Sequence, residues 1–321
     1  MFRILFLFTI AGTLIGSSSH GAESAPERIP VILDTDIGDD IDDTWALAFL
    51  LKSPEIDLKL VVGDNYKALY RARIIAKFLQ AAGQTDLPVG IGLKPEDKAG
   101  GGQSKWVETY DLASYPGKVH PDGVQAIIDT IMSSPTPVTL LAIGPVPNLA
   151  EALRRQPDIA KRARFVGMHG AVRKGYDGNP KPAAEYNVKQ DAKSCQAVFT
   201  APWDMTITPL DTCGLVRLRD AKYAKVRDSN DPIAKALIEN YRIWCGNDPK
   251  RADSGSSILF DTVAAYLCFS NQLLKMEQLS IRVTDDGMTV IDPQGKPMNV
   301  ATSWSDMAAF EDLLAQRLAN P

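Results

Sequence analysis

Residues Val31–Leu51 read VILDTDIGDDIDDTWALAFLL, and this stretch decides how the rest of the chain is interpreted. An apolar, β-branched run leads into six aspartates within ten positions (34–43), and then into a segment whose apolar residues have helical spacing. The pattern predicts a buried strand, an acidic loop and a helix. Six carboxylates this close repel one another, which is costly at the end of a buried strand unless a cation neutralises them. Because the loop offers oxygen ligands and no nearby His or Cys, it favours a hard cation, calcium or magnesium, over zinc.

The composition excludes several classes of protein. The chain has 321 residues, of which 45% are hydrophobic, and a net charge of -4. This length is enough for one large α/β domain or two small ones. This mild acidity gives no electrostatic footprint for nucleic acid, and no segment after the N-terminal one is apolar enough to cross a bilayer. No repeat, linker or change in composition divides the chain. A single domain over residues 27–321 is therefore expected.

The first 22 residues have the pattern of a secretory signal peptide. Met1–Arg3 gives a positive start, about twelve mostly apolar residues follow, and small residues then lead to an expected cleavage near Gly21 or Ala22. The apolar run is too short for a comfortable membrane span, although a retained anchor stays open. We therefore expect a secreted or periplasmic protein.

Four cysteines lie in the exported part of the chain. Their wide spacing is unlike a disulfide framework or a zinc site, although export would permit a disulfide. They are predicted to be small buried residues: Cys195, Cys213, Cys245 and Cys268.

Downstream of the acidic loop, apolar runs of strand length alternate with segments of helical spacing. Strands are expected at 58–62, 89–91, 138–143, 165–168 and 205–210, helices at 69–82, 123–132, 148–155, 191–199, 232–244, 262–270 and 306–318, and a hairpin around 286–287. This alternation predicts an α/β fold with an open, mostly parallel (mixed) sheet flanked by helices and with ligands at the carboxyl ends of its strands. The glycine-rich stretch 92–117 is expected to be either a lid or a surface excursion.

Taken together, these motifs resemble those of the inosine-uridine-preferring nucleoside N-ribohydrolase family. Its hallmark, Asp-x-Asp-x-Gly-x-Asp-Asp after the first strand, corresponds to Asp34–Gly38 followed by Asp42-Asp43. Three residues instead of the usual one separate the glycine from the final pair, which leaves open whether Asp40 takes over a role from either member of that pair. The family's further motifs are matched in the same order by Val61–Asn65, Ile143–Asn148, Met168–Gly170, Glu185–Asn187, Asp261 and Gly287–Val290.

The resemblance implies an activity and a set of site residues. The family cleaves the N-glycosidic bond of ribonucleosides with one calcium ion, which also binds the ribose 2′- and 3′-hydroxyls and a water. Asp36 would be the general base, and the aspartates would stabilise an oxocarbenium-like transition state. The calcium ligands would be Asp36, Asp43, the Ile143 carbonyl and Asp261, and the substrate would contact Asp42, Asn65, Met168, Asn179, Glu185, Asn187 and Trp244. The implied partner is a small nucleoside, and a homo-oligomer stays open.

The chain departs from the family pattern at the leaving group. Many pyrimidine-active members place a His before the late Asp, where it can protonate the departing base, but Phe260 stands here. His169 could reach the pocket, although a lone His is more often structural. Purine-preferring members sandwich the base between aromatic rings, for which Trp244, Tyr241 and Trp106 are candidates. The sequence therefore leans toward purine nucleosides, with a different riboside as the alternative.

Three rival interpretations stay open. A haloacid-dehalogenase-type phosphatase would use Asp34 as nucleophile, Asp36 as acid and magnesium as metal, but it expects Thr or Val where Gly38 stands. A non-catalytic, calcium-dependent binding protein for a ribosyl ligand would have lost turnover, with Phe260 as the sign of that loss. In the third interpretation the aspartates are solvated loop charge without a metal, which their mutual repulsion makes costly.

Overall fold

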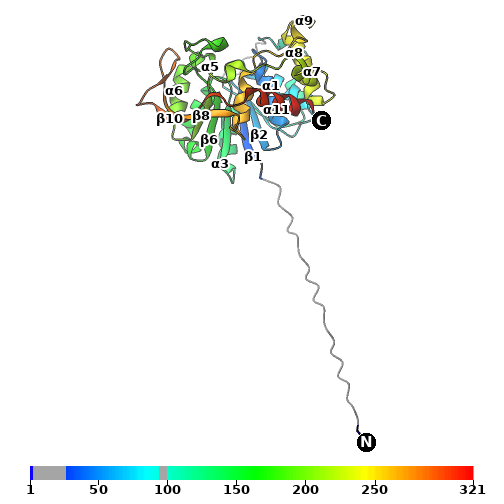
Figure 1. Cartoon of the computed structure of the whole chain (residues 1–321), viewed down its shortest axis with the longest axis horizontal. Helices are drawn as coiled ribbons and strands as arrows, with labels where there is room; N and C mark the ends of the chain where they lie inside the picture. The colour runs from blue at the N-terminus through cyan, green and yellow to red at the C-terminus, as the bar shows by residue number, and fades with distance from the viewer. Residues whose placement is uncertain (3–26, 94–99, 321) are drawn as a thin grey trace.

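The structure, a computed structural model, describes residues 1–2, 27–93 and 100–320 (Figure 1). The expected signal peptide and its cleavage site lie almost entirely outside these residues, as does part of the glycine-rich stretch. Within the described residues, no helix is both long enough and apolar enough to cross a membrane.

One mixed sheet accounts for the strands in the described part of the chain. Its order is β4-β3-β2-β1-β5-β6-β7-β10-β8-β9. Neighbours from β4 to β10 are parallel, whereas β8 is antiparallel to both β10 and β9. The strands are β1 (Ile29–Thr35), β2 (Ile56–Gly63), β3 (Val89–Ile91), β4 (Val119–His120), β5 (Val138–Ala142), β6 (Ala163–Met168), β7 (Met205–Thr208), β8 (Leu274–Val283), β9 (Thr289–Ile291) and β10 (Lys296–Trp304). The expected open, mostly parallel α/β sheet is confirmed.

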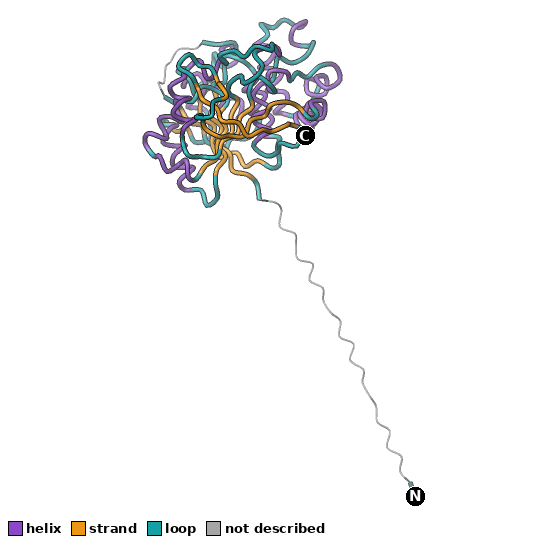
Figure 2. Tube along the Cα trace, turned by 60° about the vertical axis from the view of Figure 1, so that its left-hand side comes forward, coloured by secondary structure: helices purple, strands orange, loops and turns teal. Residues whose placement is uncertain are grey.

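Helices cover both faces of this sheet (Figure 2). The α-helices are α1 (Asp42–Leu51), α2 (Ala68–Ala81), α3 (Gly123–Ser133), α4 (Pro147–Arg155), α5 (Tyr186–Gln190), α6 (Ala192–Thr200), α7 (Asp220–Arg227), α8 (Pro232–Trp244), α9 (Pro249–Ala252), α10 (Phe260–Leu267) and α11 (Met307–Ala319). Short 3₁₀ turns are η1 (Ser104–Trp106), η2 (Leu112–Ser114), η3 (Pro157–Lys161), η4 (Tyr176–Gly178) and η5 (Cys213–Leu215).

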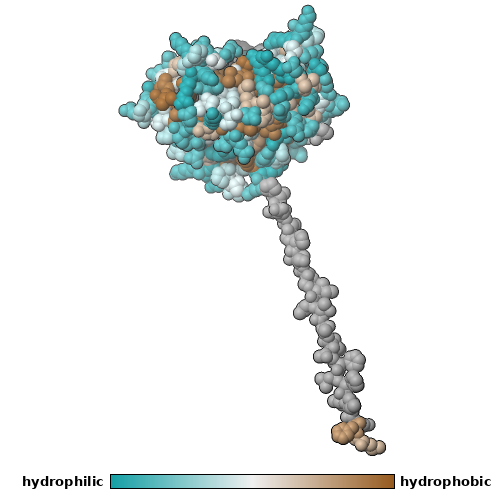
Figure 3. Space-filling model, in the orientation of Figure 1, coloured by the Kyte–Doolittle hydropathy of each residue, from teal (hydrophilic) through white to brown (hydrophobic). Residues whose placement is uncertain are grey.

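Two hydrophobic cores lie on the two faces of the sheet, because successive strand residues point to opposite sides. Val31 and Leu33 of β1 enter the core under α1, α2, α8, α10 and α11, whereas Ile32 enters the core under α3, α4 and α6. The four cysteines lie in these cores as free, buried thiols, as predicted. The molecular face seen in Figure 3 is largely hydrophilic, with small apolar spots.

Helix α1 is buried over nearly its whole length. Residues 42–50 are all buried, which fits a helix that is apolar beyond its first turn and is covered by other helices. It packs against α10 in the first core. The position of its acidic first turn is therefore fixed by the surrounding core.

Five elements were not anticipated from the sequence: the short elements β4, α5 and α9, and the longer elements β10 and α7. The hairpin β8–β9 forms around Gly287 as expected, but β10 inserts between β7 and β8 and pairs in parallel with β7. It pairs with β8 across the intervening β9 and with β7 far away along the chain, so no tight-turn signal marked it. Helix α7 was missed because it buries only Tyr223 and Val226, too few residues for a clear apolar stripe.

Candidate active site

The site lies where the order of the strands reverses. The chain steps outward from β1 to β2 on one side and from β5 to β6 on the other, so the crevice between the carboxyl ends of β1 and β5 is open to a ligand. Asp36 follows β1, Ile143 follows β5 and Met168 ends β6, and all three line a cavity of about 380 Å³ at this point.

The cavity combines acidic and aromatic side chains. Its walls are formed by Asp36, Asp39, Asp40, Asp42, Asp43, Ile143, Met168, Tyr176, Glu185, Tyr186, Asn187, Trp244, Phe260 and Asp261. Two of the expected site residues are not among them. Asn65 is buried directly behind the wall, with its Nδ2 3.5 Å from Asp36 Oδ2. Asn179 lies on an exposed loop, where its Oδ1 accepts a hydrogen bond from the Lys181 backbone, so its role stays a prediction.

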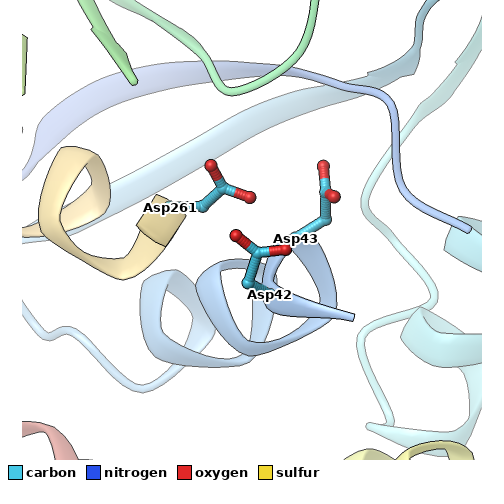
Figure 4. Close-up of side chains that lie close together, drawn as sticks. All are labelled: Asp42, Asp43 and Asp261. Carbon is cyan, nitrogen blue, oxygen red and sulfur yellow. The ribbon is translucent and has the colours of Figure 1, made fainter. Parts of the chain in front are cut away.

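Three of the carboxylates that line the cavity lie close together (Figure 4). Asp42 and Asp43 come from the first turn of α1 and Asp261 from the first turn of α10, and one oxygen of each lies within 4.8 Å of the others. Asp36 lines the same cavity outside this group, so the structure adds Asp42, expected to bind the sugar, to the expected metal ligands. Asp40 is also outside the group and accepts a hydrogen bond from the Ile41 backbone.

The three clustered carboxylates require a compensating positive charge. Burial raises the pKa of all three carboxyls well above their usual range, and repulsion from Asp40 on Asp42, from Asp36 on Asp43 and from Asp42 on Asp261 raises each further. Three buried anions cannot share this space unless they are neutralised. An all-oxygen donor set of this kind fits a hard divalent cation.

A buried arginine braces the acidic loop, and it was not singled out from the sequence. The Arg71 guanidinium donates hydrogen bonds to the Ile37 carbonyl (2.9 Å), the Asn65 carbonyl (3.0 Å) and the Asp39 carboxylate (3.0 Å). The available signal was a charged residue on the apolar face of α2. These bonds hold the loops after β1 and β2 in one arrangement.

Gln103, also missed, ties the described part of the glycine-rich stretch to the same loop. Its side-chain amide donates to the Asp40 carbonyl (2.6 Å), and its backbone N–H donates to the Gly38 carbonyl (3.2 Å). Its Oε1 accepts from the Thr44 hydroxyl (3.1 Å) and the Asn240 amide (2.6 Å). This part of the stretch is therefore attached to the acidic loop through one buried residue, Gln103.

Another wall of the cavity is fixed by the start of α5. Glu185 accepts hydrogen bonds from the backbone N–H groups of Asn187 (2.8 Å) and Gly170 (2.9 Å), and burial raises its pKa to about 7. The Asn187 amide donates to the carbonyls of Ile143 (3.2 Å) and Met168 (3.1 Å). The ends of β5 and β6 are thereby joined to one polar wall.

A model of the inosine-uridine preferring nucleoside hydrolase family matches residues 31–312, nearly all of the described fold. The chain belongs to this family. It is therefore a nucleoside hydrolase, an enzyme that cleaves the N-glycosidic bond of ribonucleosides.

Similarity to individual relatives extends over almost the full length of this nucleoside hydrolase. It is 29% identical to the pyrimidine-specific ribonucleoside hydrolase RihA of Salmonella arizonae, over 90% of this chain and 98% of the relative. It is 28% identical to the non-specific ribonucleoside hydrolase RihC of Shigella boydii, over 91% and 99%. The solved plant nucleoside hydrolase PpNRh1 shares the fold, with a TM-score of 0.77, 22% identity and coverage of 91% and 99%.

His169, a candidate for contact with the base, does not line the cavity. This nucleoside hydrolase buries His169 against the rings of Phe165 and Phe199, outside the cavity lining, with its Nε2 3.0 Å from the Gly144 carbonyl. Burial lowers its pKa to about 4. The structural alternative for this residue is therefore supported.

Among the three rings proposed to sandwich the base, Trp244 alone is part of the described cavity lining. Tyr241 stacks against Trp244, with ring centroids 5.9 Å apart. Trp106 is buried against Phe78, away from the cavity. Phe260 lines the cavity and meets the Tyr176 ring edge-on at 6.4 Å. The part of the cavity wall that contains Trp244, Phe260 and Tyr176 is thus aromatic.

The phosphatase alternative is wrong. Asp34, its required nucleophile, is fully buried, accepts a hydrogen bond from Asn148 (2.8 Å) and is absent from the cavity lining. A carboxylate in this position cannot reach a substrate.

Proposed function

We propose that this nucleoside hydrolase is an exported, calcium-dependent enzyme that releases the base from ribonucleosides, with a preference for purines. The observation that carries the calcium assignment is the buried group of Asp42, Asp43 and Asp261 beside Asp36 at the strand ends. When bound, calcium would hold the ribose diol and make a neighbouring water more acidic. The Ile143 carbonyl at the cavity wall is the uncharged oxygen that completes the proposed set of ligands.

Asp36 is the proposed general base. It lies in the cavity with the Asn65 amide behind it, and burial raises its pKa, against the opposing effect of Arg71, toward the range in which a carboxylate accepts protons efficiently. Water adds to the anomeric carbon as the bond to the base breaks, and its proton passes to Asp36. The remaining carboxylates stabilise the positive charge that develops on the sugar.

The polar wall is proposed to orient the sugar. Asn187 and Glu185 line the same cavity as the carboxylate group and are themselves fixed by hydrogen bonds, so they can hold a hydroxyl without reorganising. Met168 lies beside them. Asp42 is positioned to contact the ribose diol as well as the cation.

Export is supported by the sequence before the catalytic fold. The family match begins at residue 31, so a segment with the charge and hydropathy pattern of a signal peptide precedes the fold. N-terminal sequencing of the protein recovered outside the cytoplasm should find a chain that starts near residue 22. An intact Met1 on the mature protein would contradict export by cleavage.

The calcium assignment is tested by a panel of nucleosides scored for free base and reducing sugar. Chelation should abolish turnover, calcium should restore it, and calcium should raise the Tm of the chelated protein. Asp43→Asn and Asp261→Asn should each lose this rise in Tm, whereas Asp57→Asn, at a surface position of β2, should retain it. Turnover that is indifferent to chelation would overturn the calcium assignment, and nucleoside binding without base release would favour the binding-protein alternative.

A further inference from the structure

A second hollow, also of about 380 Å³, adjoins the active-site cavity at its base end. Asp40, Trp244 and Phe260 line both spaces. Because Phe260 immediately precedes Asp261, the hollow begins next to the carboxylate group. Its other walls include Arg217 and Arg251. Two guanidinium groups therefore lie beside the space into which a base would depart.

The loop that carries Arg217 is fixed by its neighbours. Val216 and Leu218 are buried in the core, and their carbonyls accept hydrogen bonds from the backbones of Leu259 and Ser256, both at 2.9 Å. Arg217 lies between these two inward-facing residues in extended chain, so its side chain is directed away from the core and into the hollow.

Arg217 is half-buried and unpartnered. Across the residues that the structure describes, its guanidinium makes no hydrogen bond and no ion pair. Arg251 differs, because it lies over the Trp244 ring at 4.4 Å. The hydroxyl of Ser257, another residue of the hollow, is buried without a partner. The buried Ser257 hydroxyl is costly unless a ligand completes it, whereas the Arg217 donors are open to solvent and free to meet a ligand.

We propose that Arg217 binds the departing base and selects bases that carry a carbonyl oxygen, such as hypoxanthine, guanine and uracil. This inference rests on the proposed nucleoside hydrolysis. A guanidinium has only donors, so it matches carbonyl and ring-nitrogen acceptors and disfavours an exocyclic amine. Oxopurines present O6 and N7 side by side, which suits a two-pronged contact.

This contact stabilises the departing base, which Phe260 cannot protonate. When the bond between the anomeric carbon and the base nitrogen breaks, its electron pair stays on the base, while the oxygen of water bonds to the carbon. The proton of that water passes through Asp36 to solvent, and the base takes one proton from solvent. Arg217 stays protonated throughout and stabilises the negative charge on the leaving base by hydrogen bonds.

The test compares leaving groups in the full-length enzyme. Arg217→Gln should lower kcat/KM for inosine by about 100-fold, the lower end of what the loss of one preorganised donor costs. It should leave kcat/KM for para-nitrophenyl riboside unchanged, because that leaving group departs without stabilisation by a hydrogen bond. It should also reduce the preference for inosine over adenosine. Arg217→Lys should recover part of the loss. Arg219→Gln is the matched control, since Arg219 is exposed, two residues away and outside the hollow.

Two results would overturn the assignment of Arg217. One is an equal loss on all three substrates, which indicates a structural role, and the other is no loss on inosine. Should the wild type cleave none of the three, the proposed function fails, and the assignment of Arg217 is then decided by calorimetric binding of free hypoxanthine. Binding that weakens about 10-fold in Arg217→Gln supports it, and an equal Kd overturns it.

Discussion

The two ends of the active-site cavity are built differently. The sugar end consists of buried residues at the carboxyl ends of β1, β5 and β6 and in the first turns of α1 and α10. The base end is formed by the end of α8 and the loops around α9 and η5, where Trp244 and Phe260 are half-buried and Arg251 is exposed. The bond-breaking machinery is thus anchored in the sheet, whereas the contacts to the leaving group lie on peripheral segments that can vary without displacing a strand.

The largest expected effect is at the sugar end. Asp36→Asn removes the proposed base and should lower kcat about 10²- to 10⁴-fold. The loss should be the same for inosine and for para-nitrophenyl riboside, because both need an activated water whatever group departs. Calcium should still raise the Tm of this variant. A loss confined to inosine would place Asp36 at the base end and break the contrast between the two ends.

The residues behind the sugar end should also account for much of the loss of folding stability at acidic pH. His169, behind this end, has a folded pKa of about 4, so between pH 6.5 and 4 the unfolded chain binds a proton that the folded chain does not. Stability should therefore fall as pH drops through this window, by roughly 3 kcal/mol. Urea unfolding at several pH values should show a shallower dependence for His169→Gln. His120→Gln, at a partly exposed position where burial also lowers the pKa of the imidazole, should flatten the dependence less than His169→Gln; equal slopes for all three proteins would refute this origin.

The smallest effect is a gain at the base end. Phe260→His would place a proton donor beside the leaving group and should raise kcat on inosine about 10-fold, increasingly as pH falls through about 6.5. Para-nitrophenyl riboside should show no gain. Phe260→Leu controls for loss of the ring. A gain of equal size on both substrates would show that the substitution acts on the sugar end.

The sequence predicted the sugar end far better than the base end. The acidic run and Ile143 follow strand ends and Asp261 lies in the first turn of α10, so a correct order of elements brings them together. Glu185 and Asn187 begin α5, a helix that was not predicted, and were indicated by the family resemblance. The same reasoning could not place the base end, because its shape depends on how irregular segments pack. Trp106 was a candidate there but faces the core under α2, whereas Arg217 gave no local signal.

The residues that hold the acidic loop in place, Arg71 and Gln103, were equally hard to predict from the sequence. Gln103 matters only because Thr44 and Asn240, far from it in the chain, meet it in the folded protein. Asn179 shows that membership of a motif does not by itself place a side chain in the cavity wall. Its motif neighbours enter the cavity wall, but the turn at η4 leaves Asn179 itself on the surface.

The positions of the three clustered carboxylates in the chain determine when the group is complete during synthesis. Asp42 and Asp43 leave the ribosome early, but Asp261 arrives only after most of the chain has been translated and α10 has docked on α1. A nascent or prematurely ended chain that stops before α10 holds two of the three acids. If the three acids hold the proposed cation, an incomplete copy that ends before α10 would lack the full set of ligands and should be inactive.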